Sequence, residues 1–538
     1  MVETKLADRA AARTGTVMLN AASNYLRFFV MMAGMFLLTP FIIKHIGQEE
    51  FGLWMLVMCV VGYFELLDCG MATATVKFVG QFRGAGDTVQ RDRLVSTLLL
   101  VYVLMAATIG LMGIGLAFFF SEIFQIAPAQ QQKAIAILLM LAAKVALNLP
   151  LSLFLGVLFG QQRIFAVNLV RIAAYLTYAV LAAFALHAGG GLIVLSVPRV
   201  GNHVVGAKHD PAVIFFLEHL MFFVVCRWST PDLRVRWGKF DRRVFRQVAA
   251  FSSFALITNI ATVVLLRTDP IVVKMFLPLA AVAVYALALK IAEQVLQLTK
   301  QFINVFTPLI AEMHGAGDRA GVRAAFLTSS KFGLATLAAI SIPAMYWAGE
   351  AMTLWVGPEF RLAGPIMAML IGAMHFKVLH EGASNVLGMT GGHRYVAATS
   401  ILNAVVNLGL SLMLIIPFGL PGVAFATIAA TGVIGMLFVV RKVCRDYEVG
   451  AVEYWSTTVG PVTRPALLSL TACLLLRHWC EPSSLIELAL LMGGATAVFG
   501  AAFVAMAITS SEWTILERKL PWIRRWRAGK STTPAEAS

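Results

Sequence analysis

Residues 17–42, VMLNAASNYLRFFVMMAGMFLLTPFI, decide the fold class of this chain, and Arg27 is the one charged residue among them. At about 1.5 Å of rise per residue, a helix of this length exceeds the roughly 30 Å of hydrocarbon in a bilayer. Similar apolar runs recur as far as Ile508. The chain is 59% hydrophobic and 13% charged, whereas soluble chains have about 25% charged residues. The sequence therefore predicts an all-α integral membrane protein.

The apolar runs predict fourteen transmembrane helices. The sixth is the least regular, because it contains Pro198 and the polar stretch from Lys208 to Pro211. It is expected to be either a broken helix or a short helix that follows a loop. The predicted spans are residues 16–42, 51–75, 94–120, 132–159, 164–187, 190–227, 247–273, 279–309, 325–348, 363–389, 394–416, 420–440, 461–478 and 485–508.

The basic residues indicate the orientation. The net charge is +15, but the cations lie in short loops between apolar runs, which argues against nucleic-acid binding. With the N-terminus inside, 29 of the 43 Lys and Arg residues fall in cytoplasmic segments, 7 in outside segments and 7 within spans. The positive-inside rule then predicts a multi-pass protein of the inner (plasma) membrane with both termini in the cytoplasm.

The first part of the chain recurs later. Gly84-Ala85-Gly86-Asp87 returns as Gly315-Ala316-Gly317-Asp318, and the segment 40–44 returns as 270–274. Six spans separate the copies, so both copies have the same orientation. This predicts two six-helix bundles related by a pseudo-two-fold axis along the membrane normal. The predicted division is an N-terminal bundle at 1–228, a basic cytoplasmic linker at 229–246, a C-terminal bundle at 247–445, and two extra helices with a basic cytoplasmic tail at 446–538.

Polar side chains recur at helical spacing on one face of several spans. A charged side chain facing lipid near mid-bilayer costs at least about 2.5–3.5 kcal/mol, so these faces are expected to turn inward. We predict that they line one water-filled cavity with a cationic middle. The alternative is that they hydrogen-bond between packed helices. The candidate residues are Asn24, Arg27, Lys144, Arg171, Arg267, Lys290, Gln294, Gln297, Lys377, Asn403 and Asn407.

Carboxylates inside the spans are candidates for coupling transport to H⁺ or Na⁺. They are Asp68, Asp269, Glu293 and Glu381. Each could instead form an ion pair: Asp269 with Arg267, or Glu381 with Lys377 one turn away.

Several activities are not supported by the sequence. It contains no P-loop, no HExxH and no complete GxGxxG motif. The six cysteines have no metal-ligand spacing. We therefore expect no cofactor, no metal site and no enzymatic activity.

Two stretches carry a family resemblance. The first has Pro40 near the end of a span, then Phe51-Gly52-Leu53-Trp54, Leu67-Asp68-Cys69-Gly70 and the first Gly-Ala-Gly-Asp loop. The second is Asp269-Pro270-Ile271-Val272-Val273, followed by Tyr285-Ala286-Leu287-Ala288. With the fourteen spans, the chain resembles the Wzx-type oligosaccharide flippases of polysaccharide biosynthesis, in the superfamily that also holds multidrug antiporters and lipid II flippases. Residues 190–228 depart from the family, because they are longer and more polar than its sixth helix.

The resemblance implies two bundles in a V that open alternately to each side of the membrane. It implies a cargo of undecaprenyl-pyrophosphate-linked oligosaccharide, whose lipid tail stays among the membrane lipids. The product would be O-antigen or exopolysaccharide, and the partners would be a polysaccharide polymerase and glycosyltransferases. A cationic cavity suits a pyrophosphate through charge-assisted hydrogen bonds. Two alternatives stay open: a cation-coupled multidrug antiporter of the same fold, and a membrane-embedded sugar polymerase or ligase.

The predicted topology can be tested with reporter fusions. Reporters placed after residues 87, 240, 317 and 450 should report the cytoplasm, and one placed after Pro128 should report the outside, because the loops differ in basic charge. An outside signal at either Gly-Ala-Gly-Asp loop would contradict both the topology and the repeat.

Overall fold

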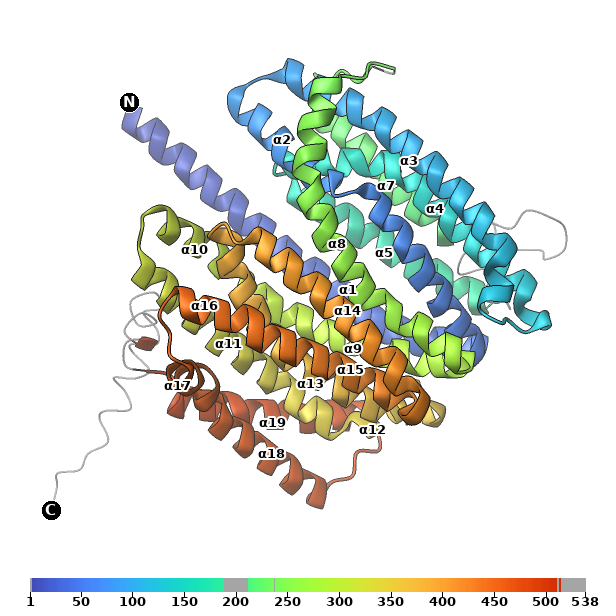
Figure 1. Cartoon of the computed structure of the whole chain (residues 1–538), viewed down its shortest axis with the longest axis vertical. Coiled ribbons are helices and arrows are strands. Elements are labelled where there is room, and N and C mark those ends of the chain that lie inside the picture. The colour runs from blue at the N-terminus through green and yellow to red at the C-terminus, as the bar shows by residue number, and fades with distance from the viewer. Residues whose placement is uncertain (1, 188–210, 237, 510–511, 514–538) are drawn as a thin grey trace.

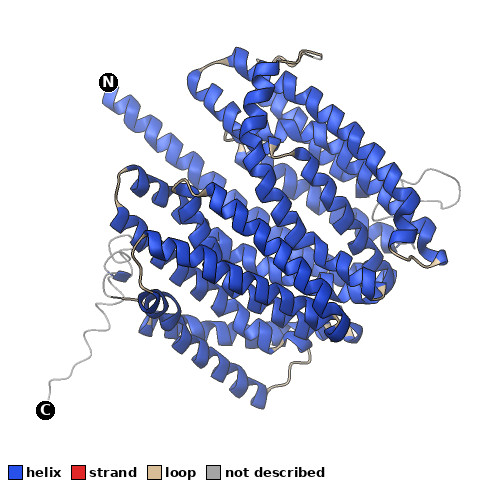
Figure 2. Cartoon of the chain, viewed as in Figure 1, coloured by secondary structure: helices blue, strands red, loops and turns tan. Residues whose placement is uncertain are grey.

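The chain forms helices throughout the part that its computed structural model describes, residues 2–187, 211–236, 238–509 and 512–513 (Figures 1 and 2). The helices form an N-terminal half and a C-terminal half that lie side by side, with α1 and α8 between them. The N-terminal half contains α1 (Val2–Gly62), the 3-10 helix η1 (Tyr63–Asp68), α2 (Met71–Ala85), α3 (Thr88–Ile123), α4 (Pro128–Gly160), α5 (Ile164–His187) and α7 (Pro211–Ser229).

The C-terminal half is longer. It contains α8 (Arg242–Phe276), α9 (Leu279–Asn304), α10 (Phe306–Gly315), α11 (Arg319–Tyr346), α12 (Ala348–Val356), the 3-10 helix η2 (Pro358–Phe360), α13 (Ala363–Met389) and α14 (His393–Phe418). A π-helical turn, η3 (Gly435–Val440), joins α15 (Leu420–Ile434) to α16 (Arg441–Asp446). A second π-helical turn, η4 (Trp455–Val459), joins α17 (Ala451–Tyr454) to α18 (Gly460–Trp479), and α19 (Leu485–Met506) follows.

Within the described residues, eleven helical segments are long and apolar enough to cross a membrane. One of them, Ala22–Asp68, contains most of the first predicted span and most of the second. Helices α7 and α8 are not among the eleven, and α8 carries six charged residues in its 35. The all-helical membrane fold is confirmed, whereas the number of fourteen spans stays a prediction. Residues 190–210 of the predicted sixth span lie outside the described residues.

Pro40 and Pro270 lie near the ends of predicted spans, but neither proline ends its helix. Pro40 lies inside α1, which continues to Gly47, where φ is 79° and ψ is 168° and the helix breaks. Pro270 lies inside α8, which continues to Phe276. A positive φ of this kind is accessible to glycine at little cost, so Gly47 makes the turn between the first two crossings.

The two Gly-Ala-Gly-Asp loops have the same local geometry, as their sequence repeat predicts. Gly86 and Gly317 have φ of 70° and 73°. In each loop the aspartate N–H donates to a carbonyl five residues back, Asp87 to Phe82 and Asp318 to Met313, both at 2.9 Å. Each aspartate then caps the next helix, through Gln90 N at 2.9 Å and Gly321 N at 2.8 Å. The repeat is therefore real at these loops, and the pseudo-two-fold axis stays a prediction. We call this side of the molecule the GAGD end and the opposite side the Gly47 end.

The two halves are joined at the Gly47 end. Gln48 Nε2 donates to the Ala280 carbonyl at 3.3 Å, and Trp355 Nε1 donates to the Phe36 carbonyl at 2.7 Å. Gly52 allows the closest approach, because a Cβ at this position would lie 2.1 Å from the Leu279 carbonyl oxygen. Helix α1 therefore packs directly on the start of α9 at this end.

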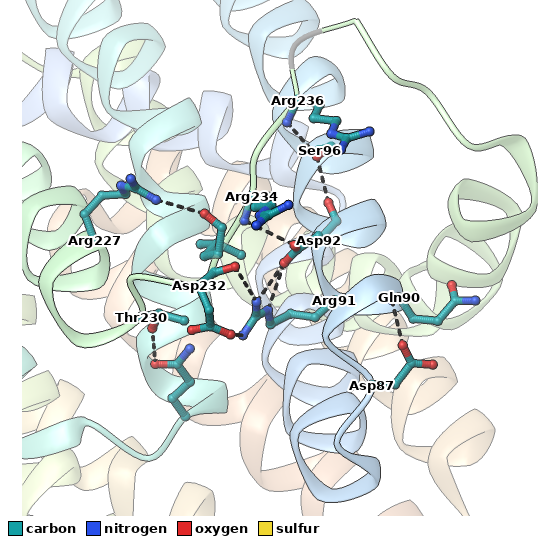
Figure 3. A network of polar contacts seen from close by, with 12 residues as sticks. Asp87, Gln90, Arg91, Asp92, Ser96, Arg227, Thr230, Asp232, Arg234 and Arg236 are labelled. Carbon is teal, nitrogen blue, oxygen red and sulfur yellow. Dashed lines mark hydrogen bonds and ion pairs between the residues drawn. The ribbon is translucent and has the colours of Figure 1, made fainter.

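At the GAGD end, residues 230–236 and 238–241 lie along α3, between the two halves (Figure 3). Side-chain oxygens of α3 accept three of the segment's backbone N–H groups: Asp92 from Arg234 at 3.2 Å, Ser96 from Arg236 at 3.0 Å, and Thr97 from Asp241 at 3.1 Å. Such bonds satisfy backbone groups that a loop would otherwise leave unpaired. The connection between the halves is thus fixed on the N-terminal half.

Candidate functional site

A cavity of about 430 Å³ lies between α1 and α5 of the N-terminal half and α9 of the C-terminal half. We call it the central cavity. Its polar lining is Arg27, Thr39, Tyr175, Tyr178, Lys290, Gln294, Gln297 and Gln301, and its apolar lining includes Met31, Met32, Phe51 and Trp54. Both halves therefore contribute a cation and hydrogen-bonding groups to the same space.

The polar wall from α9 follows from helical spacing. Lys290, Gln294, Gln297 and Gln301 are separated by four, three and four residues, which places them on one face. The residues between them, such as Ala292 and Leu296, are buried against the rest of the C-terminal half. In the structure this face lines the central cavity.

Arg27 provides the main charge from the N-terminal half. Its Nε is buried, and among the described residues it has no hydrogen-bond partner. An unpartnered donor of a buried cation is costly, so this atom is available to an anionic ligand or to water in the cavity.

Near Arg27 the structure adds a residue that sequence reasoning missed. Glu218 of α7 lies 3.8 Å from the Arg171 Nε, and its charge also acts on Arg27 and Lys144. The sequence does contain an indication of this residue, because Glu218 is a lone carboxylate in an apolar run. It was overlooked because the limits of the sixth span were uncertain.

Lys144 and Arg267 line a second cavity, of about 300 Å³, together with Glu65, Asn148, Ser152 and His219. The expectation of one cavity holding all the cations is therefore wrong. The cations are distributed because each helix turns its polar face toward its own neighbours, and these differ from span to span.

Lys377 and Glu381 form a cluster in the C-terminal half. Glu381 Oε1 lies 2.6 Å from the Nζ of Lys300 and 3.7 Å from the Nζ of Lys377. The pairing of Lys377 with Glu381 was an open alternative in the sequence, and the geometry supports it. Lys300, on α9, is an additional partner.

The predicted candidates Asp269 and Asn407 belong to a buried hydroxyl network. Asp269 accepts hydrogen bonds from Tyr285 at 2.7 Å, Thr427 at 3.2 Å and Ser411 at 3.3 Å. Asn407 donates to Thr427 at 3.1 Å. The described ion pairs do not include one between Asp269 and Arg267, so hydroxyl groups rather than a cation satisfy this carboxylate.

The remaining candidates are placed between packed helices or beside the cavities. Asn24 accepts from Asn168 of α5 at 2.8 Å, and Asp68 accepts from Tyr102 of α3 at 2.7 Å. Asn403 is buried in α14. Glu293 lies on α9 and interacts electrostatically with Arg267 and Lys290. Among the described residues no group of three His, Cys, Asp or Glu side chains could hold a metal ion.

Thiol labelling can separate the cavity wall from the buried network. In a chain whose six cysteines are replaced by alanine, Gln297→Cys should react with a membrane-impermeant maleimide, because Gln297 lines the central cavity and is exposed. Asn407→Cys should react far more slowly, because Asn407 is only 1% exposed. Equal labelling of the two variants would contradict the assignment of the wall.

Comparisons with known proteins agree with this architecture. Residues 211–356 match the model of a family described as "Polysaccharide biosynthesis protein". The chain is 21% identical over 459 residues to the uncharacterized membrane protein EpsK of Bacillus subtilis (strain 168), covering 85% of this chain and 88% of the relative.

Solved structures extend the likeness to most of the chain. A structure of the lipid II flippase MurJ in an inward closed conformation has a TM-score of 0.66, 13% identity, and coverage of 90% of this chain and 98% of MurJ. An inward-facing multidrug resistance transporter of the MATE family, in the MOP superfamily, has a TM-score of 0.64, 15% identity, and coverage of 78% of this chain and 98% of the transporter. The chain therefore has the fold shared by MurJ and the MATE transporters.

Proposed function

We propose that this protein is a flippase that moves a lipid-linked oligosaccharide across the inner membrane, for synthesis of a surface polysaccharide such as O-antigen or exopolysaccharide. The fold is one that both a lipid flippase and multidrug transporters use. The match of residues 211–356 to a polysaccharide biosynthesis family favours a sugar-bearing cargo over a drug.

The composition of the central cavity is the observation that carries the proposal. Arg27 from one half and Lys290 from the other provide charge-assisted hydrogen bonds for a pyrophosphate. The amides of Gln294, Gln297 and Gln301 provide donors and acceptors for sugar hydroxyl groups. The cargo's polyprenyl tail would stay in the bilayer, since only the head group is costly to move through hydrocarbon.

In this proposal, the charge of the cargo favours closure of the two halves around the central cavity. Arg27 and Lys290 have the same sign and lie on opposite halves, so they repel each other across an empty cavity. A pyrophosphate between them attracts both cations and draws the halves together at the GAGD end. The contacts at the Gly47 end would then open, and the cargo would leave on that side.

Coupling to H⁺ or Na⁺ stays part of the proposal at Glu293. This carboxylate is one helical turn from Lys290 on the same helix. Binding of an ion there would change the charge next to the cavity wall. Asp68, Asp269 and Glu381 are less suited, because each already has the polar partners described above.

The two rival functions lack a specific observation in their favour. A drug antiporter for cationic compounds would be expected to have carboxylates in its cavity, and the central cavity has cations instead. A sugar polymerase or ligase would need paired catalytic groups near the Gly47 end, and none was identified among the described residues. Partner proteins such as a polymerase and glycosyltransferases belong to the same proposal.

Removing either cavity cation should impair transport. Arg27→Ala and Lys290→Ala should each cost about 1.5–3 kcal/mol of cargo binding, the range for hydrogen bonds to charged groups. Polysaccharide export in cells should fall by about tenfold or more when transport limits synthesis. Arg27→Lys should restore only part of it, because Lys cannot reproduce the planar guanidinium fork.

Lys44→Ala is the matched control, because Lys44 is an exposed cation at the Gly47 end and takes part in no ion pair among the described residues. Its export should stay normal. Membrane levels of every variant must be measured by immunoblot. Normal export by both cavity variants at normal levels would contradict the proposal.

A further inference from the structure

A basic depression of about 810 Å³ lies at the GAGD end, outside the central cavity. It is formed by the start of α3, by residues 234, 236 and 238–241, and by the start of α8. We call it the basic basin, and it is defined by its six cations, Arg93, Arg234, Arg236, Lys239, Arg242 and Arg243. Two carboxylates, Asp92 and Asp241, also line it, which leaves an excess of four positive charges.

Both carboxylates of the basin are engaged elsewhere. Asp92 binds the Arg91 guanidinium at 2.8 Å, and Asp241 caps α8 by accepting from Arg243 N at 2.9 Å and Val244 N at 3.2 Å. Within the described part of the chain, no ion pair includes any of the six cations. The basin thus keeps an excess of positive charge, and none of its six cations is in a described ion pair, so it attracts anions.

The backbone that carries these cations is held in place. Figure 3 shows Arg234 and Arg236 on the segment that runs beside α3, with Asp92 and Ser96 accepting their N–H groups. Arg91 of α3, which is 7% exposed, also holds this segment, because its guanidinium donates to the Asp232 carboxylate at 2.9 Å. A site with a fixed backbone loses less entropy on binding than a free loop would.

Apolar side chains beside the basin favour a lipid as its ligand. Val89 and Phe240 line the basin and are 58% and 47% exposed, and Trp228, at the end of α7 just before the connecting segment, is 85% exposed. Helix α3, which is long and apolar enough to cross a membrane, begins at the basin, so the basin is expected at the level of lipid head groups. Aromatic residues next to cations are typical of this level. A soluble phosphate compound would make no apolar contact with these exposed side chains, whereas a lipid would.

We propose that the basic basin binds the phosphate groups of anionic phospholipids, and that the bound lipid holds the start of α8 against α3. Arg93 belongs to α3, whereas Arg242 and Arg243 belong to α8, the first helix of the C-terminal half. A phosphate between them bridges the two halves at the point where the chain passes from one to the other. The inference does not depend on which cargo the central cavity takes.

The test measures lipid binding to the purified full-length protein in detergent by native mass spectrometry. The basin variant is Arg234→Gln, Arg236→Gln and Arg242→Gln together. It should bind phosphatidylglycerol at least about tenfold more weakly than the parent, because each cation near a membrane surface contributes to binding anionic lipid. Binding of phosphatidylcholine should be weak in both proteins and unchanged by the substitutions.

The matched control removes three exposed cations from the same end of the C-terminal half, Arg441→Gln, Arg445→Gln and Arg464→Gln. It should keep phosphatidylglycerol affinity within about twofold, because these residues lie outside the basin. The same three basin positions changed to Lys should also keep the affinity, since the charge is retained. That variant separates lost charge from lost folding.

Three outcomes would overturn the proposal. An equal loss of affinity in the basin variant and the control would show that net charge alone matters. A loss in the Lys variant as large as in the Gln variant would show that the arginines act on the fold. Inorganic phosphate binding as tightly as phosphatidylglycerol, and displacing it, would assign the basin to a soluble anion.

Discussion

The cost of leaving charge in hydrocarbon shapes this molecule more than any other interaction. The eleven apolar helical segments found among the described residues still contain Arg27, Lys144, Arg171, Lys290 and Lys377. Each must find water, a hydrogen-bond acceptor or an anion. Arg171 has Glu218, and Lys377 shares Glu381 with Lys300. Arg27 and Lys290 instead face the central cavity. This difference in how the cations are satisfied separates groups that support the fold from groups that are available to a ligand.

The periodic parts of the fold could be predicted from the sequence, and the tertiary pairings could not. The stripe from Lys290 to Gln301 faces the cavity because helical spacing alone determines one face. The paired loops at Gly86 and Gly317 share their geometry because identical residues meet the same turn requirement. By contrast, two of the three hydroxyl groups around Asp269 come from Ser411 and Thr427, which are 142 and 158 residues away, and only Tyr285 comes from the next helix. The sequence around Asp269 does not indicate that a tyrosine, a serine and a threonine, rather than Arg267, would be the partners of this carboxylate.

The same limit explains the two errors in the predicted site. All mid-depth cations were assigned to one cavity because depth can be counted along a helix, whereas the direction of a face depends on its neighbours. Lys144 consequently lines a different cavity from Arg27. Glu218 was missed because the predicted sixth span, 190–227, is irregular around Pro198 and residues 208–211, so its limits were uncertain. Its charge matters, since it partly offsets the cations of α1, α4 and α5.

The central claim is that the cationic cavity passes a lipid-linked oligosaccharide from one leaflet to the other. The most direct measurement reconstitutes the purified protein into liposomes with a fluorescent undecaprenyl-pyrophosphate oligosaccharide and follows quenching by a membrane-impermeant reductant. The account predicts that the fraction of lipid accessible from outside rises from about half toward all of it in vesicles that contain the protein, and stays near half in empty vesicles. The account would be contradicted if accessibility stayed near half with the protein present while the same vesicles transported a cationic dye.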